Sequence, residues 1–216
     1  IYALPLAPAA VNEVSCEGGL IPDLTATGTA LTWYDDLALT NQVGTGSNFA
    51  TGQTLSGAYT YYVSEVDLNT CESNATTVTL EIYSLPSSPL ATNESACFGT
   101  TIPPLSTIGT PLTNWYDDSG LTNVVQAGGN SYLTGQTAVG VYTYYITDTD
   151  ANGCESNPST VALEIFALPL APAATNEVAC EGGLIPDLTA TGTVLTWYDD
   201  ATLALTSQVG TGSNFA

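Results

Sequence analysis

The stretch Leu31-Thr32-Trp33-Tyr34-Asp35-Asp36 decides how the chain is organised, because its last four residues return at residues 115–118 and 197–200. The cysteine at position 16 returns in the same register, after 81 and 83 residues (97 − 16 and 180 − 97), as Cys97 and Cys180. A fixed period predicts a tandem array. Because this period exceeds the ~20–50 residues of a solenoid repeat, we expect each unit to be a small domain.

The repeats are of two types. We expect residues 1–2 to end a preceding repeat, residues 3–84 to form a repeat of type A, residues 85–166 one of type B, and residues 167–216 the first part of a third repeat, again of type A. Residues 3–36 and 167–200 are nearly identical, whereas the middle repeat is diverged. Since Ala216 aligns with Ala50, inside a repeat, we expect the chain to be a window from a longer protein.

Each repeat has the sequence pattern of a β-sandwich. In residues 77–82, and again in residues 159–165, apolar and polar residues alternate as in a half-buried strand. Residues 59–63 and 142–146 are Tyr-rich strands, and glycines supply turns between the strands. About seven short strands per repeat predict an all-β fold of tandem immunoglobulin-like antiparallel β-sandwiches in a linear array.

The composition excludes several classes of function. The chain has no Lys, Arg or His and carries 21 acidic residues, for a net charge of −21. It therefore offers no cation to nucleic acid or to an anionic membrane, and no apolar run reaches the ~18 residues of a membrane span. Without a His or Lys base, the Ser, Thr and Cys side chains lack an activating partner. We expect no enzymatic activity, and we interpret the repeated Asp-Asp pair as a turn.

The cysteines fall in register. The first repeat has Cys16 and Cys71, the second has Cys97 and Cys154, and the third has Cys180. One pair per repeat, without His, predicts one structural disulfide in each repeat and an oxidising compartment. We expect the bridges Cys16–Cys71 and Cys97–Cys154 at one end of each sandwich, with the partner of Cys180 outside the sequence. Zinc held by four cysteines is the rival interpretation, which the wide spacing disfavours.

One loop has the opening of a calcium site. Asp148, Asp150 and Asn152 stand before Gly153 in the pattern D-x-D-x-N-G. The Glu that closes such a loop is missing, since Ser159 occupies its position. A hairpin with an Asn-Gly turn is the alternative. We therefore expect no cofactor, with calcium at these residues as the exception to be tested.

We expect four tyrosines to face away from the core side of their strands. They are Tyr34, Tyr62, Tyr116 and Tyr145. Aromatic side chains on a sheet face either bind sugar rings or cover neighbouring strands. The sequence leaves both interpretations open.

Several motifs together resemble a known family. They are Cys16-Glu17-Gly18, Thr32 to Asp36, Gly57 to Val63, Cys71-Glu72-Ser73 and Val78 to Ile82. The combination, which covers the whole chain, is similar to the Ig-like repeats of large secreted proteins of Bacteroidota associated with type IX secretion. Such repeats occur in cell-surface and gliding adhesins and as spacers in secreted enzymes. The resemblance implies an extracellular or cell-surface location.

These observations predict a structural role. The segment Leu-Pro-x-x-Pro at residues 4–8, 85–89 and 168–172 favours semi-rigid joints between repeats. We expect a shaft segment of a bacterial surface adhesin or extracellular filament. Its expected partners are neighbouring repeats of the same chain, other copies in a filament and surface polysaccharide. The alternatives are a polysaccharide-binding module and spacer domains of a secreted enzyme.

Overall fold

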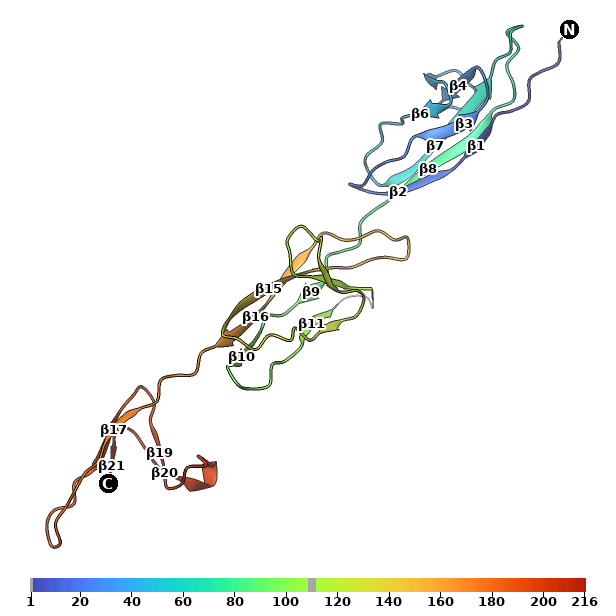
Figure 1. Cartoon of the computed structure of the whole chain (residues 1–216). Helices are drawn as coiled ribbons and strands as arrows, with labels where there is room; N and C mark the ends of the chain where they lie inside the picture. The colour runs from blue at the N-terminus through green and yellow to red at the C-terminus, as the bar shows by residue number, and fades with distance from the viewer. Residues whose placement is uncertain (1, 109–111) are drawn as a thin grey trace. The chain divides into compact units, whose positions relative to one another are not determined.

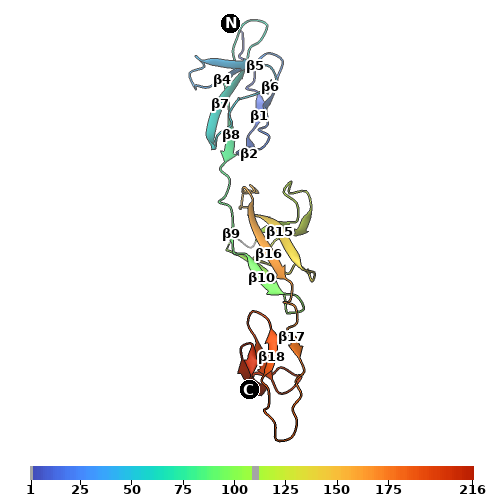
Figure 2. The same cartoon turned by 90° about the vertical axis from the view of Figure 1, so that its left-hand side faces the viewer.

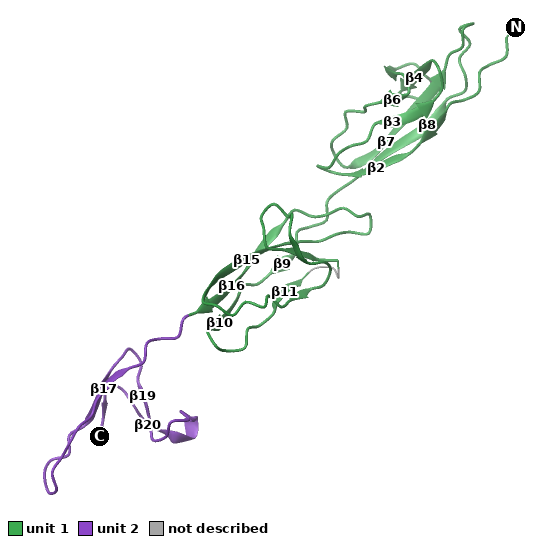
Figure 3. Cartoon of the chain, viewed as in Figure 1, with its two compact units in different colours: residues 1–166 green, residues 167–216 purple. Residues whose placement is uncertain are grey.

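The computed structural model describes residues 2–108 and 112–216 (Figure 1). Ile1, which we assigned to the end of a preceding repeat, lies outside these residues. Regular structure in the described part is β-strand in both views (Figures 1 and 2), apart from the short 3₁₀ helix η1 (Leu205–Ser207). The chain divides into two compact units, residues 1–166 and residues 167–216 (Figure 3). No helix in the described part of the chain is long and apolar enough to span a membrane.

The first repeat consists of two sheets. The larger sheet has the order β2-β8-β7-β4-β5, with the strands β2 (Glu13–Cys16), β8 (Thr76–Tyr83), β7 (Gly57–Glu65), β4 (Leu31–Tyr34) and β5 (Gln42–Thr45). The smaller sheet has the order β1-β3-β6, with the strands β1 (Ala9–Val11), β3 (Leu24–Thr27) and β6 (Asn48–Phe49).

The core of this repeat follows from the alternation of side chains along the strands. In β8 the even-numbered residues from Val78 to Ile82 are buried and those between them are not, because successive side chains of a strand point to opposite faces. Trp33 is fully buried, stacks on Phe49 with ring centroids 5.4 Å apart, and donates its indole N–H to the Gly46 carbonyl at 2.8 Å. The indole therefore fills the core and satisfies its one donor.

The second repeat has the same arrangement. Its larger sheet has the order β10-β16-β15-β12-β13, with the strands β10 (Glu94–Cys97), β16 (Ser159–Phe166), β15 (Gly140–Thr147), β12 (Asn114–Tyr116) and β13 (Val124–Gln126). Its smaller sheet has the order β14-β11-β9, with the strands β14 (Ser131–Tyr132), β11 (Leu105–Ile108) and β9 (Leu90–Ala91). The two repeats bury separate clusters of apolar side chains, around Trp33 and around Trp115. The prediction of tandem Ig-like sandwiches is confirmed.

Residues 167–216 form two small sheets. One contains β17 (Ala173–Thr175), β18 (Leu188–Thr191) and β21 (Asn214–Phe215), and the other pairs β19 (Thr196–Tyr198) with β20 (Gln208–Thr211). Trp197 stacks on Phe215 as Trp33 does on Phe49. However, Leu188 is 38% exposed, whereas its equivalent Leu24 is fully buried. The type A strands are thus present without the Tyr-rich and final strands that cover the core of the first repeat.

The acidic pairs end their strands in turns. Asp36 accepts hydrogen bonds from the backbone N–H groups of Thr40 and Asn41, at 3.0 and 2.7 Å. Asp118 does the same with Thr122 and Asn123, at 3.0 and 2.7 Å. In both cases these bonds, first of all the one from the asparagine N–H, lower the pKa of the carboxyl. These carboxylates therefore organise turns.

Candidate functional site: the bridge between the first two repeats

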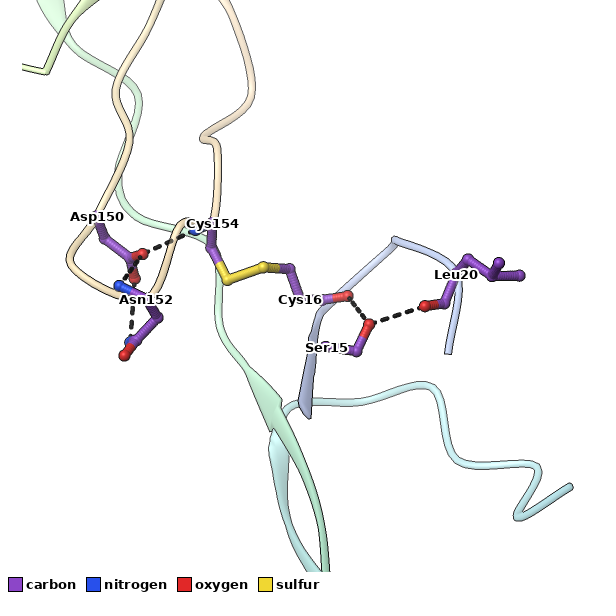
Figure 4. The surroundings of a disulfide bond; sticks show 6 residues. All are labelled: Ser15, Cys16, Leu20, Asp150, Asn152 and Cys154. Atoms are coloured by element: carbon purple, nitrogen blue, oxygen red, sulfur yellow. Dashed lines mark hydrogen bonds between the residues drawn. A yellow bond between two sulfur atoms is a disulfide. The ribbon is translucent and has the colours of Figure 1, made fainter. Parts of the chain in front are cut away.

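A disulfide joins Cys16 of the first repeat to Cys154 of the second (Figure 4). The Cα atoms are 5.6 Å apart, and the two cysteines are separated by 138 residues in sequence. Cys16 is the last residue of β2, and Cys154 lies in the turn between β15 and β16. The bridge therefore connects two sandwiches whose apolar cores are otherwise separate.

The predicted pairings within repeats, Cys16–Cys71 and Cys97–Cys154, are wrong. Strand β2 runs parallel to β8, which places Cys16 opposite Tyr83, whereas Cys71 precedes Thr76, the first residue of β8. At ~3.3 Å per residue, the ends of this eight-residue strand are about 23 Å apart. The Cα atoms of a disulfide lie within ~7 Å of each other. The two cysteines of the first repeat thus lie at opposite ends of their sandwich, and those of the second repeat follow the same pattern, with Cys97 opposite Phe166.

The turn after Cys16 is fixed by backbone hydrogen bonds. Glu17 N–H donates to the Tyr83 carbonyl at 2.8 Å, and Gly19 N–H donates to the Cys16 carbonyl at 3.0 Å. Gly18 has a φ of 78°, in the left-handed region that glycine adopts without a steric penalty. The Ser15 hydroxyl adds a bond to the Leu20 carbonyl at 2.9 Å (Figure 4). The Cys-x-Gly motif is therefore the device that turns the chain sharply beside the cysteine.

The turn that carries Cys154 is organised by Asp150. One carboxylate oxygen of Asp150 accepts the N–H groups of Asn152 and Cys154, both at 2.9 Å (Figure 4). The Cys154 carbonyl accepts the Asp150 N–H at 3.0 Å, and Gly153 has a φ of 82°. Such a side-chain–backbone arrangement mimics a backbone turn. The turn holds Cys154, which is fully buried, in place for the bridge.

The Cys-Glu-Ser motif ties this turn to the sheet. Glu155 accepts hydrogen bonds from the Tyr116 hydroxyl, at 2.6 Å, and from the Thr147 hydroxyl. Ser156 accepts the Asp148 N–H at 2.9 Å. Residues after the cysteine therefore connect the turn to strands β12 and β15, which holds the sulfur at a defined position.

The first repeat repeats this network around Cys71. Glu72 accepts hydrogen bonds from the hydroxyls of Tyr34 and Ser64, at 2.9 and 2.6 Å. Burial first of all, and then the hydrogen bond to the glutamate, raises the pKa of both Tyr34 and Tyr116. Each tyrosine consequently keeps its proton and remains a donor across the neutral pH range.

The structure gives the predicted calcium ligands other partners. One carboxylate oxygen of the buried Asp148 accepts the Thr113 hydroxyl at 2.9 Å. Asp150 is turned toward the backbone N–H groups of its own turn, and Asn152 donates one of them. Among residues 2–108 and 112–216, no group of three or more His, Cys, Asp or Glu side chains is arranged to hold a metal ion. Calcium binding stays a prediction.

The four tyrosines of the predicted sugar face form two cross-strand pairs. Tyr34 lies opposite Tyr62, and Tyr116 lies opposite Tyr145. Tyr116 is only 4% exposed and offers no ring face to a ligand, whereas the other three are half-buried. The hydroxyl bonds of Tyr34 and Tyr116 agree with one of the two interpretations left open above, in which these side chains cover the sheet.

Three cysteines are unpaired in the structure. Cys71 is half-buried, and Cys97 and Cys180 are exposed. All five cysteines stand out in the sequence, but their pairing does not, because the parallel pairing of β2 with β8 carries no sequence signal of its own. The usable signal was the position of Cys71 after the Tyr-rich strand, which already departs from the order of an antibody domain.

Residues 5–83 match a family model described as an Ig-like domain, CHU_C associated. The match falls on the first repeat, which is similar to an Ig-like domain of this kind. No curated protein matches the chain.

Among solved structures, the chain is similar to fibronectin(III)-like modules of Clostridium thermocellum CbhA, with 15% identity, 76% of this chain and 92% of that chain covered, and a TM-score of 0.40. It is also similar to extracellular domains 3–5 of Drosophila OTK, with 12% identity, 93% and 81% covered, and a TM-score of 0.27. A SusE-like surface-located polysaccharide-binding protein from the heparin utilisation locus of Bacteroides thetaiotaomicron shares 12% identity, with 73% and 33% covered and a TM-score of 0.28. We base no functional inference on these three structures, whose TM-scores lie below 0.5.

Proposed function

We propose that the chain is a load-bearing shaft segment of an extracellular or cell-surface protein that serves adhesion or gliding. The observation that carries this proposal is the Cys16–Cys154 bridge, which couples two separately folded sandwiches covalently. In a shaft it transmits tension from one domain to the next while residues 17–153 stay inside the covalent loop.

The bridge shortens the covalent path that tension follows. A pull on the ends of the chain runs through residues 1–16, crosses the sulfur atoms and continues from Cys154 into β16. Strands β2 and β16 are already extended, at ~3.3 Å per residue, close to the maximum length of a chain. Residues 17–153 lie inside the covalent loop and carry no tension while the bridge is intact.

The composition supports an exposed, extended setting. A net charge of −21 without a single cation keeps such a chain soluble and self-repelling. The absence of Lys and Arg also leaves no site for trypsin-like proteases. The location and the adhesive role rest on the resemblance to secreted Ig-like repeats.

Single-molecule pulling on the two chain termini tests the proposal. With the bridge intact, about 480 Å of contour length, at ~3.5 Å for each of the 138 residue steps, should stay hidden. The Cys16→Ser variant should release that length in unfolding steps, and Cys97→Ser, which alters an unpaired cysteine, should behave as the parent. Release of the full length by the oxidised parent would contradict a load-bearing bridge.

A second candidate function is polysaccharide binding, for which the half-buried cross-strand pair of Tyr34 and Tyr62 is the supporting observation. A glycan array probed with the whole chain tests it. Binding that is lost in Tyr62→Ala together with Tyr145→Ala would favour this function. An array without signal would dismiss it.

A further inference from the structure

The first two repeats carry their cysteines in one of two structural settings. In the first, the cysteine ends a strand that runs parallel to the last strand of its repeat, and a sharp turn follows it. In the second, the cysteine lies in the turn that precedes that last strand. The bridge in the structure joins a cysteine of the first kind, Cys16, to one of the second kind, Cys154, in the next repeat.

Cys97 is of the first kind, whereas Cys180 lies between β17 and β18, outside both strands, and shares with Cys16 the turn that follows it. The residue after Cys97 donates its N–H to the Phe166 carbonyl at 2.8 Å, as the residue after Cys16 does with Tyr83. The carbonyl of Cys97 accepts the N–H of Thr100 at 3.1 Å, and that of Cys180 accepts the N–H of Gly183 at 2.9 Å. These bonds match the one from Gly19 to the Cys16 carbonyl.

Cys71 is of the second kind. Its N–H donates to a carboxylate oxygen of Asp67 at 2.8 Å, and its carbonyl accepts the Asp67 N–H at 3.0 Å. The corresponding distances between Cys154 and Asp150 are 2.9 and 3.0 Å. Leu68, beside this turn, is fully exposed, so the end of the sandwich that presents Cys71 also presents an apolar side chain.

We propose that Cys71 is a disulfide site for a first-kind cysteine of a repeat placed before it in the same chain. The rule is that the first cysteine of each repeat bonds to the second cysteine of the repeat that follows. By the same rule, Cys97 and Cys180 form disulfide bonds with the second cysteines of the repeats that follow theirs. The bridge seen between Cys16 and Cys154 is then one step of a covalent ladder, in which each junction has a peptide link and a disulfide.

The chemistry of each step is an ordinary thiol oxidation. Two thiols lose two protons and two electrons and form one S–S bond. A small disulfide such as oxidised glutathione accepts the electrons and leaves as two thiols. In a mixture of oxidised and reduced glutathione the exchange is reversible, so the pairing that forms is the one that the folded geometry favours.

The sequence permits a direct test in an extended chain. A copy of residues 85–164 is placed ahead of Ile1. Residues 1–2 then follow the copy in the way that residues 165–166 follow residue 164 in the parent chain. The copied Cys97 then precedes Cys71 by 138 residues, of which 67 lie in the copy and 71 in the parent chain. This is the separation of Cys16 from Cys154. After folding in a glutathione mixture, non-reducing peptide mapping identifies the bonds.

We expect the copied Cys97 to be linked to Cys71. The copied Cys154 should keep a free thiol and therefore be recovered as an alkylated peptide. In the same sample, the Cys16–Cys154 bridge reports that the chain has folded. A Cys71 that remains free there, or a bond between the copied Cys97 and the copied Cys154, would overturn the proposal. A matched chain with Cys71→Ser should leave the copied Cys97 free and the Cys16–Cys154 bridge intact. This result does not depend on the shaft function, since the bonds form without load and pulling tests only what they transmit.

Discussion

Cys16 and Tyr83 lie side by side at one end of the first sandwich, because β2 and β8 run parallel. The chain leaves the sandwich after Tyr83 toward the second repeat, so the first cysteine is carried to the junction by the same strand pairing that completes the sheet. Cys71 is at the other end of β8. A cysteine at each end of a domain suits links between domains.

The first prediction concerns the bonding pattern of the chain itself. Digestion at both Asp and Glu under non-reducing conditions separates Cys97 from Cys154, because Asp117, Asp118 and Asp148 lie between them. We expect one linked peptide pair, containing Cys16 and Cys154, and alkylated peptides for the other three cysteines. Mass spectrometry that finds Cys16 joined to Cys71 would refute the structure at this site.

The second prediction separates coupling from folding. Replacing both bridge residues, Cys16→Ser and Cys154→Ser, should leave each sandwich folded, because their apolar clusters share no residue. Near-ultraviolet circular dichroism of the buried Trp33 and Trp115 should therefore be unchanged. Small-angle scattering should report a wider range of distances than in the parent, since one of two covalent links is gone. The variant Cys97→Ser serves as the control, and a loss of both tryptophan signals in the double variant would show that the bridge is needed for folding.

The sequence was sufficient for the fold of each repeat but not for the link between repeats. Alternation in residues 77–82 and 159–165 predicts the strands and the core, because burial of one sheet face imposes a period of two. The strand at Glu13–Cys16 is short, and its burial pattern shows no clean alternation. Its parallel pairing with β8 is set by tertiary contacts, and this pairing decides which cysteines can meet.

The candidate site was predicted in its parts and missed as a whole. Cys16, Cys154 and the Cys-Glu-Ser motif all stand out in the sequence, yet nothing local says that Glu155 accepts a hydrogen bond from Tyr116, 39 residues away. The tyrosines were assigned to an outward face, and the hydroxyl of Tyr116 instead supports the turn of the bridge. Long-range polar contacts of this kind have no periodic signature.

The third prediction is that the stability contributed by the strand-ending turns is lost in acid. The pKa of Asp118 is lowered from its ordinary value of 3.8, first of all by the hydrogen bond from the N–H of Asn123. A lowered carboxyl pKa stabilises the fold above the unfolded-state pKa, and this contribution is lost as the pH falls through the folded-state value. The variant Asp118→Ala should melt at a lower temperature than the parent at pH 6, and the difference should shrink as the pH falls below the ordinary carboxyl pKa of 3.8.

Thermal melts monitored by circular dichroism between pH 2.5 and pH 6 give this comparison. Asp23→Ala, which removes an exposed carboxylate just before β3, controls for the change in net charge. A difference between parent and Asp118→Ala that stays constant over this range would contradict the assigned cause, because the carboxylate would then not be the group that titrates.

The last prediction tests whether the Cys-Glu-Ser network holds the bridge in place. Tyr116→Phe removes the hydroxyl that donates to Glu155 at 2.6 Å, while Thr147 keeps its own bond to that glutamate. Losing a hydrogen bond to a charged group costs about 1.5–3 kcal/mol, and the loss falls on the turn that contains Cys154. We expect more frequent opening of this turn, and hence faster reduction of the Cys16–Cys154 bond by a small thiol.

Tyr34→Phe is the matched control, since it removes the equivalent bond to Glu72 beside the unpaired Cys71. The control should destabilise its own repeat by a similar amount and leave the reduction rate of the bridge unchanged. Equal reduction rates in Tyr116→Phe and the parent would mean that the backbone bonds of Asp150 alone position the sulfur.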